Sequence, residues 1–294
     1  KKIIINKIKY FLVIIFIKTP LINILKKRFK NSHNIKKRNK IWLLLDTLFQ
    51  IEYFSKLKNK KEIRELTNST LINGEGRKWS LHYFDTHFST LEGLKKRKGI
   101  MSSSNAPPIF EKMINFIKSN NIYENENTYI IQLGSSSGKD LEFFLKIFPK
   151  LNYISTDVND EIIDFQKERY NYSNLKYFKC YAEDIDKCIN YFNISDKNII
   201  LFSVGSLQYI NPIFLEEFFL KIKQFKKINL FIYDPKELSF IEKNKDIISN
   251  YRWNSSFSHR YDEYARKLGS KIIESKIIRP FLKEDKRHSN TGIF

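Results

Sequence analysis

The stretch "TYIIQLGSSSGKDLEFFL", residues 128–145, joins an apolar, β-branched run to a turn rich in glycine and serine, and then to a helical pattern. Gly134 permits a tight turn, and Gly138 lets the backbone and the following helix approach closely. Ser137 and Asp140 have the Ser-x-x-acid spacing of a helix N-terminus. We therefore expect a strand, a turn and a helix in this order.

Apolar runs of the same kind recur along the rest of the chain, with helical stretches between them. They lie at residues 152–155, 176–181, 199–204 and 228–233. Because these runs do not alternate strictly between apolar and polar residues, they indicate a parallel sheet that helices cover on both faces. The C-terminal segments "SKIIESKII" and "HSNTGIF" leave no room for a helix between them, so we expect them to pair antiparallel at one edge of the sheet.

Three classes of ligand compete for the turn, because open α/β sheets bind ligands beyond the carboxyl ends of their strands. A mononucleotide phosphate loop requires four residues between its glycines and a hydroxyl after its lysine, whereas "GSSSGKD" has three residues and Asp140 there. A dinucleotide turn requires Gly-x-Gly-x-x-Gly, and position 136 is a serine. A nucleoside without phosphates requires only close approach of the backbone, so the turn favours this third class.

The strands after the turn supply acidic residues for such a nucleoside. "YISTDVND" ends its strand with Asp157, 23 residues after Gly134, where a carboxylate can accept hydrogen bonds from both ribose hydroxyls. In "CYAEDI", Glu183 or Asp184 can accept a hydrogen bond from an adenine amine while Ala182 lies along the ring.

Five ordered segments resemble the class I S-adenosylmethionine-dependent methyltransferases over about residues 106–294. They are "IIQLGSSSG", "YISTDVND", "KCYAEDI", "LFSVGSLQYI" and "NLFIYDP". The resemblance implies an α/β fold with a Rossmann-like seven-stranded sheet, mostly parallel with one reversed strand, and S-adenosylmethionine as the cofactor. The cofactor-binding residues that it implies are Gln132, Gly134, Ser135, Ser136, Gly138, Asp157, Val158, Ala182, Glu183, Asp184 and Ser203.

The chain departs from the family's pattern at two positions of the turn. Ser136 stands where the family usually has a third glycine, and Gln132 stands where it has an acidic residue. Gln132 thus removes a carboxylate that would attract the methionine ammonium group. The alternative to an active enzyme is a catalytically weak or inactive scaffold with the methyltransferase fold, which binds a membrane or a partner through its N-terminus.

The formal charge of +20 is concentrated in residues 1–60, which hold 16 Lys and Arg against 2 Asp and Glu. The apolar "YFLVIIFI" there precedes a polybasic stretch, a combination typical of segments that lie on an anionic membrane surface. Lys18 and Pro20 interrupt the apolar stretch and argue against a spanning helix. Burial of this stretch against the protein is the alternative to membrane contact.

These patterns predict three parts of the chain. Residues 1–60 form a helical extension that contacts an anionic membrane surface through residues 1–40. Residues 61–105 form a connector or lid, and residues 106–294 form the methyltransferase-like domain. The predicted location is the cytoplasm, including the inner face of the membrane.

Composition and spacing argue against several other functions. Two cysteines do not form a disulfide scaffold and fit a reducing compartment. Five scattered histidines lack the spacing of a zinc site, so no metal is expected. The chain after residue 60 is only modestly basic, which argues against a nucleic-acid substrate.

The predicted reaction is methyl transfer to a small molecule or to a membrane-associated lipid or saccharide precursor. Alignment of two reactants can contribute about 7–11 kcal/mol, so the reaction does not require a strong base. His259 and His82 are the candidate bases for a hydroxyl acceptor. Tyr209, Trp79 and Tyr83 are the candidate contacts with the methyl acceptor.

Overall fold

The computed structural model describes residues 59–61, 63–64, 107–236, 247–251, 256–278 and 291–293. The chain divides into two compact units, Lys1–Trp79 with Tyr251–Ser256, and Ser80–Asn250 with Phe257–Phe294. The second unit carries the predicted cofactor site. Most of the predicted extension and lid, and with them Trp79, His82 and Tyr83, lies outside the described residues.

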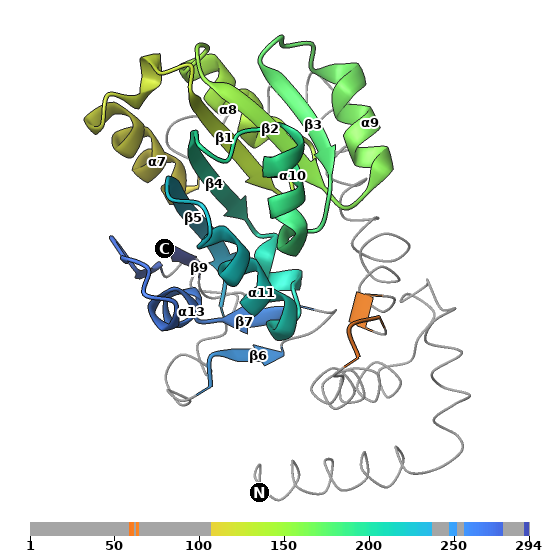
Figure 1. Ribbon diagram of the computed structural model, residues 1–294, viewed down its shortest axis with the longest axis vertical. Coiled ribbons are helices and arrows are strands. Elements are labelled where there is room, and N and C mark those ends of the chain that lie inside the picture. Colours follow the sequence, from red (N-terminus) through yellow and green to blue (C-terminus); the bar gives the residue numbers. More distant parts are fainter. Residues whose placement is uncertain are drawn as a thin grey trace, which may run out of the picture. The chain divides into compact units, whose positions relative to one another are not determined.

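The second unit is built on a sheet in the order β3-β2-β1-β4-β5-β9-β8, which Figure 1 shows in part. Its strands are β1 (Thr128–Leu133), β2 (Asn152–Asp157), β3 (Leu175–Lys179), β4 (Asn198–Val204), β5 (Ile228–Pro235), β8 (Lys276–Ile278) and β9 (Thr291–Ile293). β1 to β5 are parallel, whereas β9 runs antiparallel to both β5 and β8. The predicted α/β, mostly parallel, Rossmann-like sheet is confirmed, as is the antiparallel pairing of the two C-terminal segments. Two further strands, β6 (Ser249–Tyr251) and β7 (Phe257–His259), pair separately.

Helices lie on both faces of the sheet, and α8 to α11 connect its parallel strands (Figure 1). They are α7 (Pro108–Ser119), α8 (Lys139–Ile147), α9 (Asp160–Arg169), α10 (Ile185–Tyr191), α11 (Pro212–Ile222) and α13 (Tyr261–Lys267), with the 3-10 turns η2 (Ile122–Glu124), η3 (Ala182–Asp184) and η4 (Leu207–Tyr209). Asparagines start two of these helices, because the side-chain oxygens of Asn159 and Asn211 each accept a backbone N–H at 3.1 Å.

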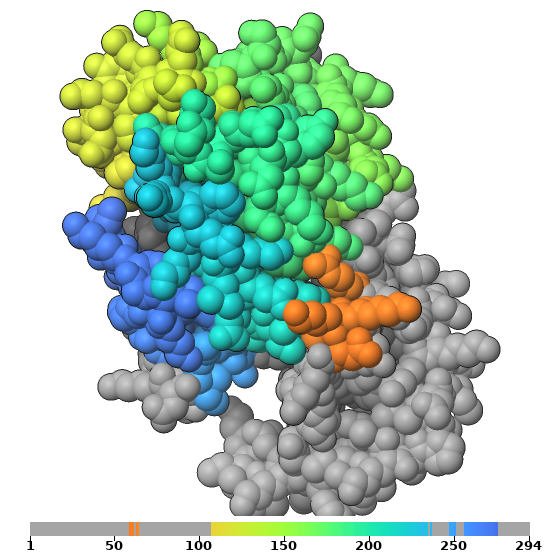
Figure 2. Space-filling model, in the orientation of Figure 1, coloured from red at the N-terminus to blue at the C-terminus, as the bar shows by residue number. Residues whose placement is uncertain are grey.

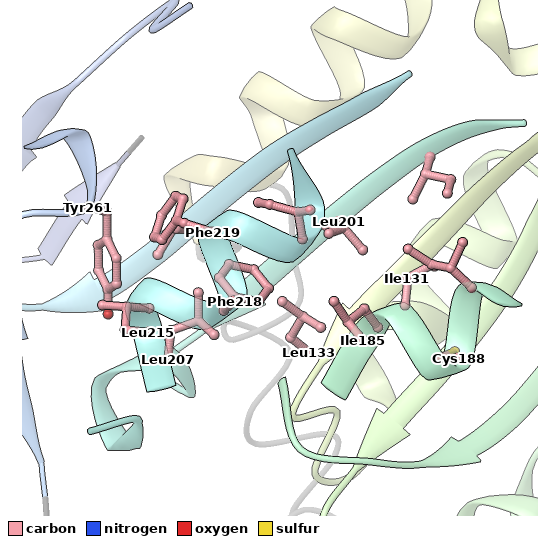
Figure 3. Close-up of a cluster of buried hydrophobic side chains, with 14 of the residues drawn as sticks. Ile131, Leu133, Ile185, Cys188, Leu201, Leu207, Leu215, Phe218, Phe219 and Tyr261 are labelled. Atoms are coloured by element: carbon pink, nitrogen blue, oxygen red, sulfur yellow. The ribbon is translucent and has the colours of Figure 1, made fainter. Parts of the chain in front are cut away.

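Two hydrophobic clusters fill the spaces between the sheet and its helices. The first lies under α10, α11 and α13 and takes Ile131, Leu133 and Leu201 from the strands (Figure 3). The second lies against α7 and α8 and takes Ile130 and Phe202. The alternation within β1 and β4 follows from the two-residue period of a strand and shows that both faces of the sheet are buried. In the space-filling view, α10 and α11 form part of the surface that faces the viewer (Figure 2).

The sheet order fixes where a ligand can bind. β2 and β3 follow β1 on one side, whereas β4 and β5 lie on its other side, so the direction of the connections reverses between β1 and β4. Open α/β sheets bind ligands in the crevice that this reversal leaves beyond the carboxyl ends of the strands. In this chain the reversal point lies between β1 and β4, beside the turn that follows β1.

The Tyr153 hydroxyl is a buried contact between β2 and the end of α8. Its oxygen lies 2.9 Å from the carbonyl oxygen of Phe144 and 2.8 Å from that of Phe148, so its single proton is shared between them. We expect Tyr153→Phe to lower the free energy of unfolding by roughly 1–2 kcal/mol, because both carbonyls keep a backbone partner but lose the phenol. Urea titration measures this loss. Tyr191→Phe is the control, since Tyr191 is 68% exposed, and an equal loss in both variants would contradict the account.

Candidate functional site

The turn between β1 and α8 adopts left-handed backbone angles at three positions. The φ angles are +68° at Gly134, +48° at Ser136 and +75° at Gly138. Serine rarely adopts such an angle, so Ser136 is held in this conformation by its surroundings. The turn brings residues 134–138 to the carboxyl edge of the sheet, as the sequence predicts.

Helix α9 supports one side of the turn. The Gln166 side-chain amide donates to the Ser135 hydroxyl at 2.9 Å and to the Ser136 carbonyl oxygen at 2.6 Å. The Tyr170 hydroxyl donates to the Ser137 carbonyl oxygen at 3.0 Å. A Cβ atom on Gly138 would lie 2.7 Å from Tyr170 Cε2, so only glycine fits there. The close approach at Gly138 is to Gln166 of α9 and to Tyr170 at its C-terminal end, and not to the helix that follows the turn.

Ser206, in the loop after β4, lies against the other end of the turn. Its hydroxyl donates to the Gly134 carbonyl oxygen at 3.0 Å. A Cβ atom on Gly134 would lie 2.4 Å from Ser206 Oγ. The protein's own packing therefore requires both glycines of the turn, and their presence alone does not indicate a ligand.

Three N–H groups of the turn donate hydrogen bonds to acceptors within the protein. Ser135 N–H donates to the Thr156 carbonyl oxygen at 2.8 Å, and Gly138 N–H donates to the Ser135 carbonyl oxygen at 2.9 Å. Ser136 N–H donates to Asp157 Oδ2 at 3.1 Å. A phosphate site requires free N–H donors and positive charge, whereas this turn commits three donors and has a carboxylate beside it. The spacing of the glycines argues against a phosphate loop, and the geometry of the turn agrees.

Asp157 ends β2 and lies directly against the turn. Besides Ser136 N–H, its carboxylate accepts the N–H of Asn159, at 3.1 Å on Oδ1. The side chain is largely buried, and burial raises the pKa of the carboxyl to about 6, with the backbone N–H groups opposing this shift. A carboxylate has about four lone-pair positions, so Asp157 keeps capacity for further donors at the tip of β2.

Gln132 and Asp140 form a second polar pair at this edge. Gln132 is 1% exposed, and its Nε2 donates to Asp140 Oδ2 at 3.0 Å. Its Oε1 atom is buried without a hydrogen-bond donor among the described residues. A buried acceptor without a donor costs roughly 1–3 kcal/mol, so this atom requires a ligand or a water to explain it. Burial raises the pKa of Asp140 to about 6, and the hydrogen bond from Gln132 opposes this shift.

The predicted adenine contacts lie in η3, after β3. Glu183 is buried and Ala182 packs against the first hydrophobic cluster. The Asp184 carboxylate is 3.3 Å from the ammonium groups of both Lys187 and Lys221. Asp184 is therefore a partner in ion pairs within the protein, and its contact with adenine stays a prediction.

The remaining predicted residues occupy neighbouring strand ends. Val158 is partly buried between Asp157 and Asn159. Ser203 in β4 is fully buried, and its hydroxyl accepts the N–H of Leu207 at 3.3 Å. Tyr209, the candidate substrate contact, is half-buried in η4.

His259, a candidate base, lies in β7 and is 1% exposed. Its Nδ1 atom is 2.7 Å from the Ser249 hydroxyl, which also contacts the Tyr264 hydroxyl at 2.8 Å. Burial lowers the pKa of His259 to about 3, and its hydrogen bond with the Ile210 backbone opposes this shift. The imidazole is therefore neutral at pH 7 and far from the pKa that suits a general base at that pH. The structure favours a structural role for it.

Sequence reasoning missed the residues that shape the turn from other elements. Gln166, Tyr170 and Ser206 are 31, 33 and 72 residues from their partners in the turn. No local pattern marks such contacts. Asp140 is visible in the sequence, because it stands where a phosphate loop has a hydroxyl. Its pairing with Gln132 is not visible there.

No family model and no curated protein matches the sequence. Solved structures similar to the chain include a SAM-dependent methyltransferase from Anabaena variabilis (11% identity, TM-score 0.44, covering 64% of this chain and 83% of that one). A putative methyltransferase from Thermobifida fusca has 13% identity and a TM-score of 0.46, and the match covers 78% of this chain and 92% of that one. A SAM-dependent methyltransferase from Archaeoglobus fulgidus has 16% identity and a TM-score of 0.39, with 69% and 98% covered. The likeness concerns the fold alone, which is the α/β arrangement that the sequence resemblance implies.

Proposed function

We propose that the protein binds S-adenosylmethionine and transfers its methyl group to a small molecule or to a membrane-associated lipid or saccharide precursor. One observation carries the proposal. The side chains beside the turn are acceptors, namely the Asp157 carboxylate and the Gln132 Oε1 atom, while three N–H donors of the turn itself are committed inside the protein. This composition suits a nucleoside that carries positive charge and no phosphate.

The residues present fit the two polar ends of this cofactor. Asp157 has lone pairs for ribose hydroxyls at the tip of β2. Gln132 and Asp140 provide acceptors at the end of β1, one of which is buried without a donor among the described residues. Ala182 and Glu183 lie beyond β3, where an adenine ring would follow the ribose. When bound, the cofactor supplies an activated methyl carbon on a sulfonium.

The chain's own contribution to the reaction is binding, orientation and exclusion of water. The turn is held on both sides, by α9 and by Ser206, so its position is fixed before a ligand arrives. A fixed site can align the methyl carbon with the acceptor, which contributes about 7–11 kcal/mol without a strong base. We propose Tyr209, with Trp79, His82 and Tyr83 of the connector or lid, as the residues that meet the acceptor.

The alternative is an inactive or weakly active scaffold with the same fold. Two contacts favour it: Asp157 already accepts the N–H groups of Ser136 and Asn159, and Ser206 lies against Gly134. The partner of such a scaffold would bind through residues 1–60.

We also propose that residues 1–40 contact an anionic membrane surface from the cytoplasmic side. Sixteen of the chain's 52 basic residues lie in residues 1–60, beside an apolar stretch, which supports this assignment. Within the ranges that the structure describes, no helix is long and apolar enough to cross a bilayer. Flotation with anionic liposomes, with and without residues 1–40, tests the contact; equal flotation of both forms would reject it.

Four ligands that contain adenosine test the proposed cofactor. S-adenosylmethionine and S-adenosylhomocysteine are expected to raise the melting temperature, since a ligand at 100 times its Kd stabilises by about 2.7 kcal/mol. ATP and NAD are expected to have no effect at the same concentration, because the turn commits its donors. Stabilisation by ATP or NAD alone would reject the proposal, and stabilisation by none of the four would favour the scaffold.

A further inference from the structure

Gln132 is a buried amide whose hydrogen bonds are incomplete. It lies in β1, one residue before the end of the strand, and is 1% exposed. Its backbone carbonyl oxygen accepts the Thr156 hydroxyl at 2.7 Å and its Nε2 atom donates to Asp140. Within the described part of the chain, its Oε1 atom has no donor. A buried acceptor of this kind indicates that a donor from outside the protein completes the site.

Asp140 provides a second acceptor beside this amide. It lies in the first turn of α8, a position where any acidic side chain is favoured by the helix dipole. Its carboxylate, however, accepts a hydrogen bond from Gln132 Nε2 at 3.0 Å, across to the strand. The helix dipole therefore explains its charge but not its pairing with a strand residue eight positions earlier.

The two acceptors define which group can complete the site. One is a neutral amide oxygen and the other a carboxylate, and both lie at the carboxyl end of β1. An anion would be repelled by Asp140, and a neutral hydroxyl supplies one donor for two acceptors. A primary ammonium group supplies three donors and a positive charge, so it satisfies both acceptors at once.

We infer that Gln132 and Asp140 together bind the α-ammonium group of the cofactor's amino-acid end. This inference rests on the proposed function. Asp140 then supplies, from the helix, the negative charge that is missing at position 132 in the strand. Gln132 holds the Asp140 carboxylate in place with its N–H group and offers its own oxygen to the ammonium.

Two ligands that differ at this end separate the role of Asp140 from cofactor binding in general. S-adenosylhomocysteine and 5′-methylthioadenosine share the adenosine and the thioether, but only the first carries the ammonium group. Calorimetric titration gives the Kd of each ligand. For Asp140→Asn we expect the Kd of S-adenosylhomocysteine to rise at least tenfold, about 1.4 kcal/mol, and that of 5′-methylthioadenosine to stay within twofold.

Glu142→Gln is the matched control, because it removes the same charge from the same helix two residues further on. Glu142 pairs with Lys146 instead of the strand, and its loss should change neither Kd. Gln132→Met, a second variant of similar length, should also weaken S-adenosylhomocysteine selectively. Thermal melting confirms that each variant is folded before it is titrated.

The outcomes are distinct. An equal loss of affinity for both ligands in Asp140→Asn, or no loss for either, would overturn the inference and leave the cofactor proposal standing. A water on Gln132 Oε1 in place of the ammonium predicts this second result. Failure of the wild-type protein to bind either ligand would overturn the proposed function and the inference with it.

Discussion

Asp157→Asn is expected to weaken binding of S-adenosylhomocysteine by about 100-fold or more, because two hydrogen bonds to a charged group contribute about 1.5–3 kcal/mol each. Asparagine keeps the size of the side chain and one oxygen that can accept the Ser136 or the Asn159 N–H. The change therefore removes the charge that ribose hydroxyls would meet while it preserves most of the turn. Calorimetry measures the Kd of both proteins.

Asp164→Asn is the control for this loss of charge. Asp164 lies on α9, is 65% exposed in its side chain and pairs with Lys167. It should bind the ligand as the wild type does. A loss of similar size in both variants would show that net charge, and not the position of Asp157, governs binding.

The pH dependence of binding gives a second readout on Asp157. Its pKa is raised to about 6 by burial in the protein without ligand. Ribose hydroxyls donate to the ionised form, so affinity should be constant above about pH 7 and fall as the pH decreases through 6. We expect this fall with 5′-methylthioadenosine, which cannot engage Asp140 through an ammonium group, and its disappearance in Asp157→Asn. Tighter binding at acid pH would contradict the assignment.

Gly134→Ala is expected to lower the free energy of unfolding by roughly 2–4 kcal/mol. Two causes add. The φ angle of +68° disfavours any residue with a Cβ atom, and this Cβ atom would lie 2.4 Å from Ser206 Oγ and 2.6 Å from Ser206 Cβ. Urea titration measures the loss.

Two further variants separate these causes. Gly269 has a φ angle of +73°, and no atom lies within 4 Å of the position that a Cβ atom would take there, so Gly269→Ala should lose only the backbone part, about 1 kcal/mol. Ser206→Gly removes both clashing atoms, so the double variant with Gly134→Ala should be more stable than the sum of the single changes predicts. If the losses in free energy of unfolding were strictly additive, Ser206 would not clash with a Cβ atom at position 134.

The strands were predictable because their signal is local. Each of the runs at residues 128–133, 152–155, 199–204 and 228–233 is apolar and β-branched, and each coincides with a parallel strand. The strands β1, β2 and β4 are buried on both faces, whereas β5 is mostly partly buried. The antiparallel pairing at the C-terminus was also predictable, because the short segment between the two runs excludes a crossover helix.

The detailed site was less predictable, because its contacts join distant segments. Asp157 follows from its position at a strand end, but its bonds to Ser136 and Asn159 depend on the shape of the turn. The pairing of Gln132 with Asp140 depends on how α8 leaves the sheet. His259 was a candidate base in the sequence, but the sequence does not reveal the burial that lowers the pKa of this histidine to about 3.

The most direct measurement is a crystal structure of the protein with S-adenosylhomocysteine bound. We expect the adenosine to lie across the tips of β1, β2 and β3, with both ribose hydroxyls about 2.5–3.0 Å from the Asp157 carboxylate oxygens. A nucleoside bound elsewhere, or one whose ribose leaves Asp157 bonded only to Ser136 and Asn159, would contradict it.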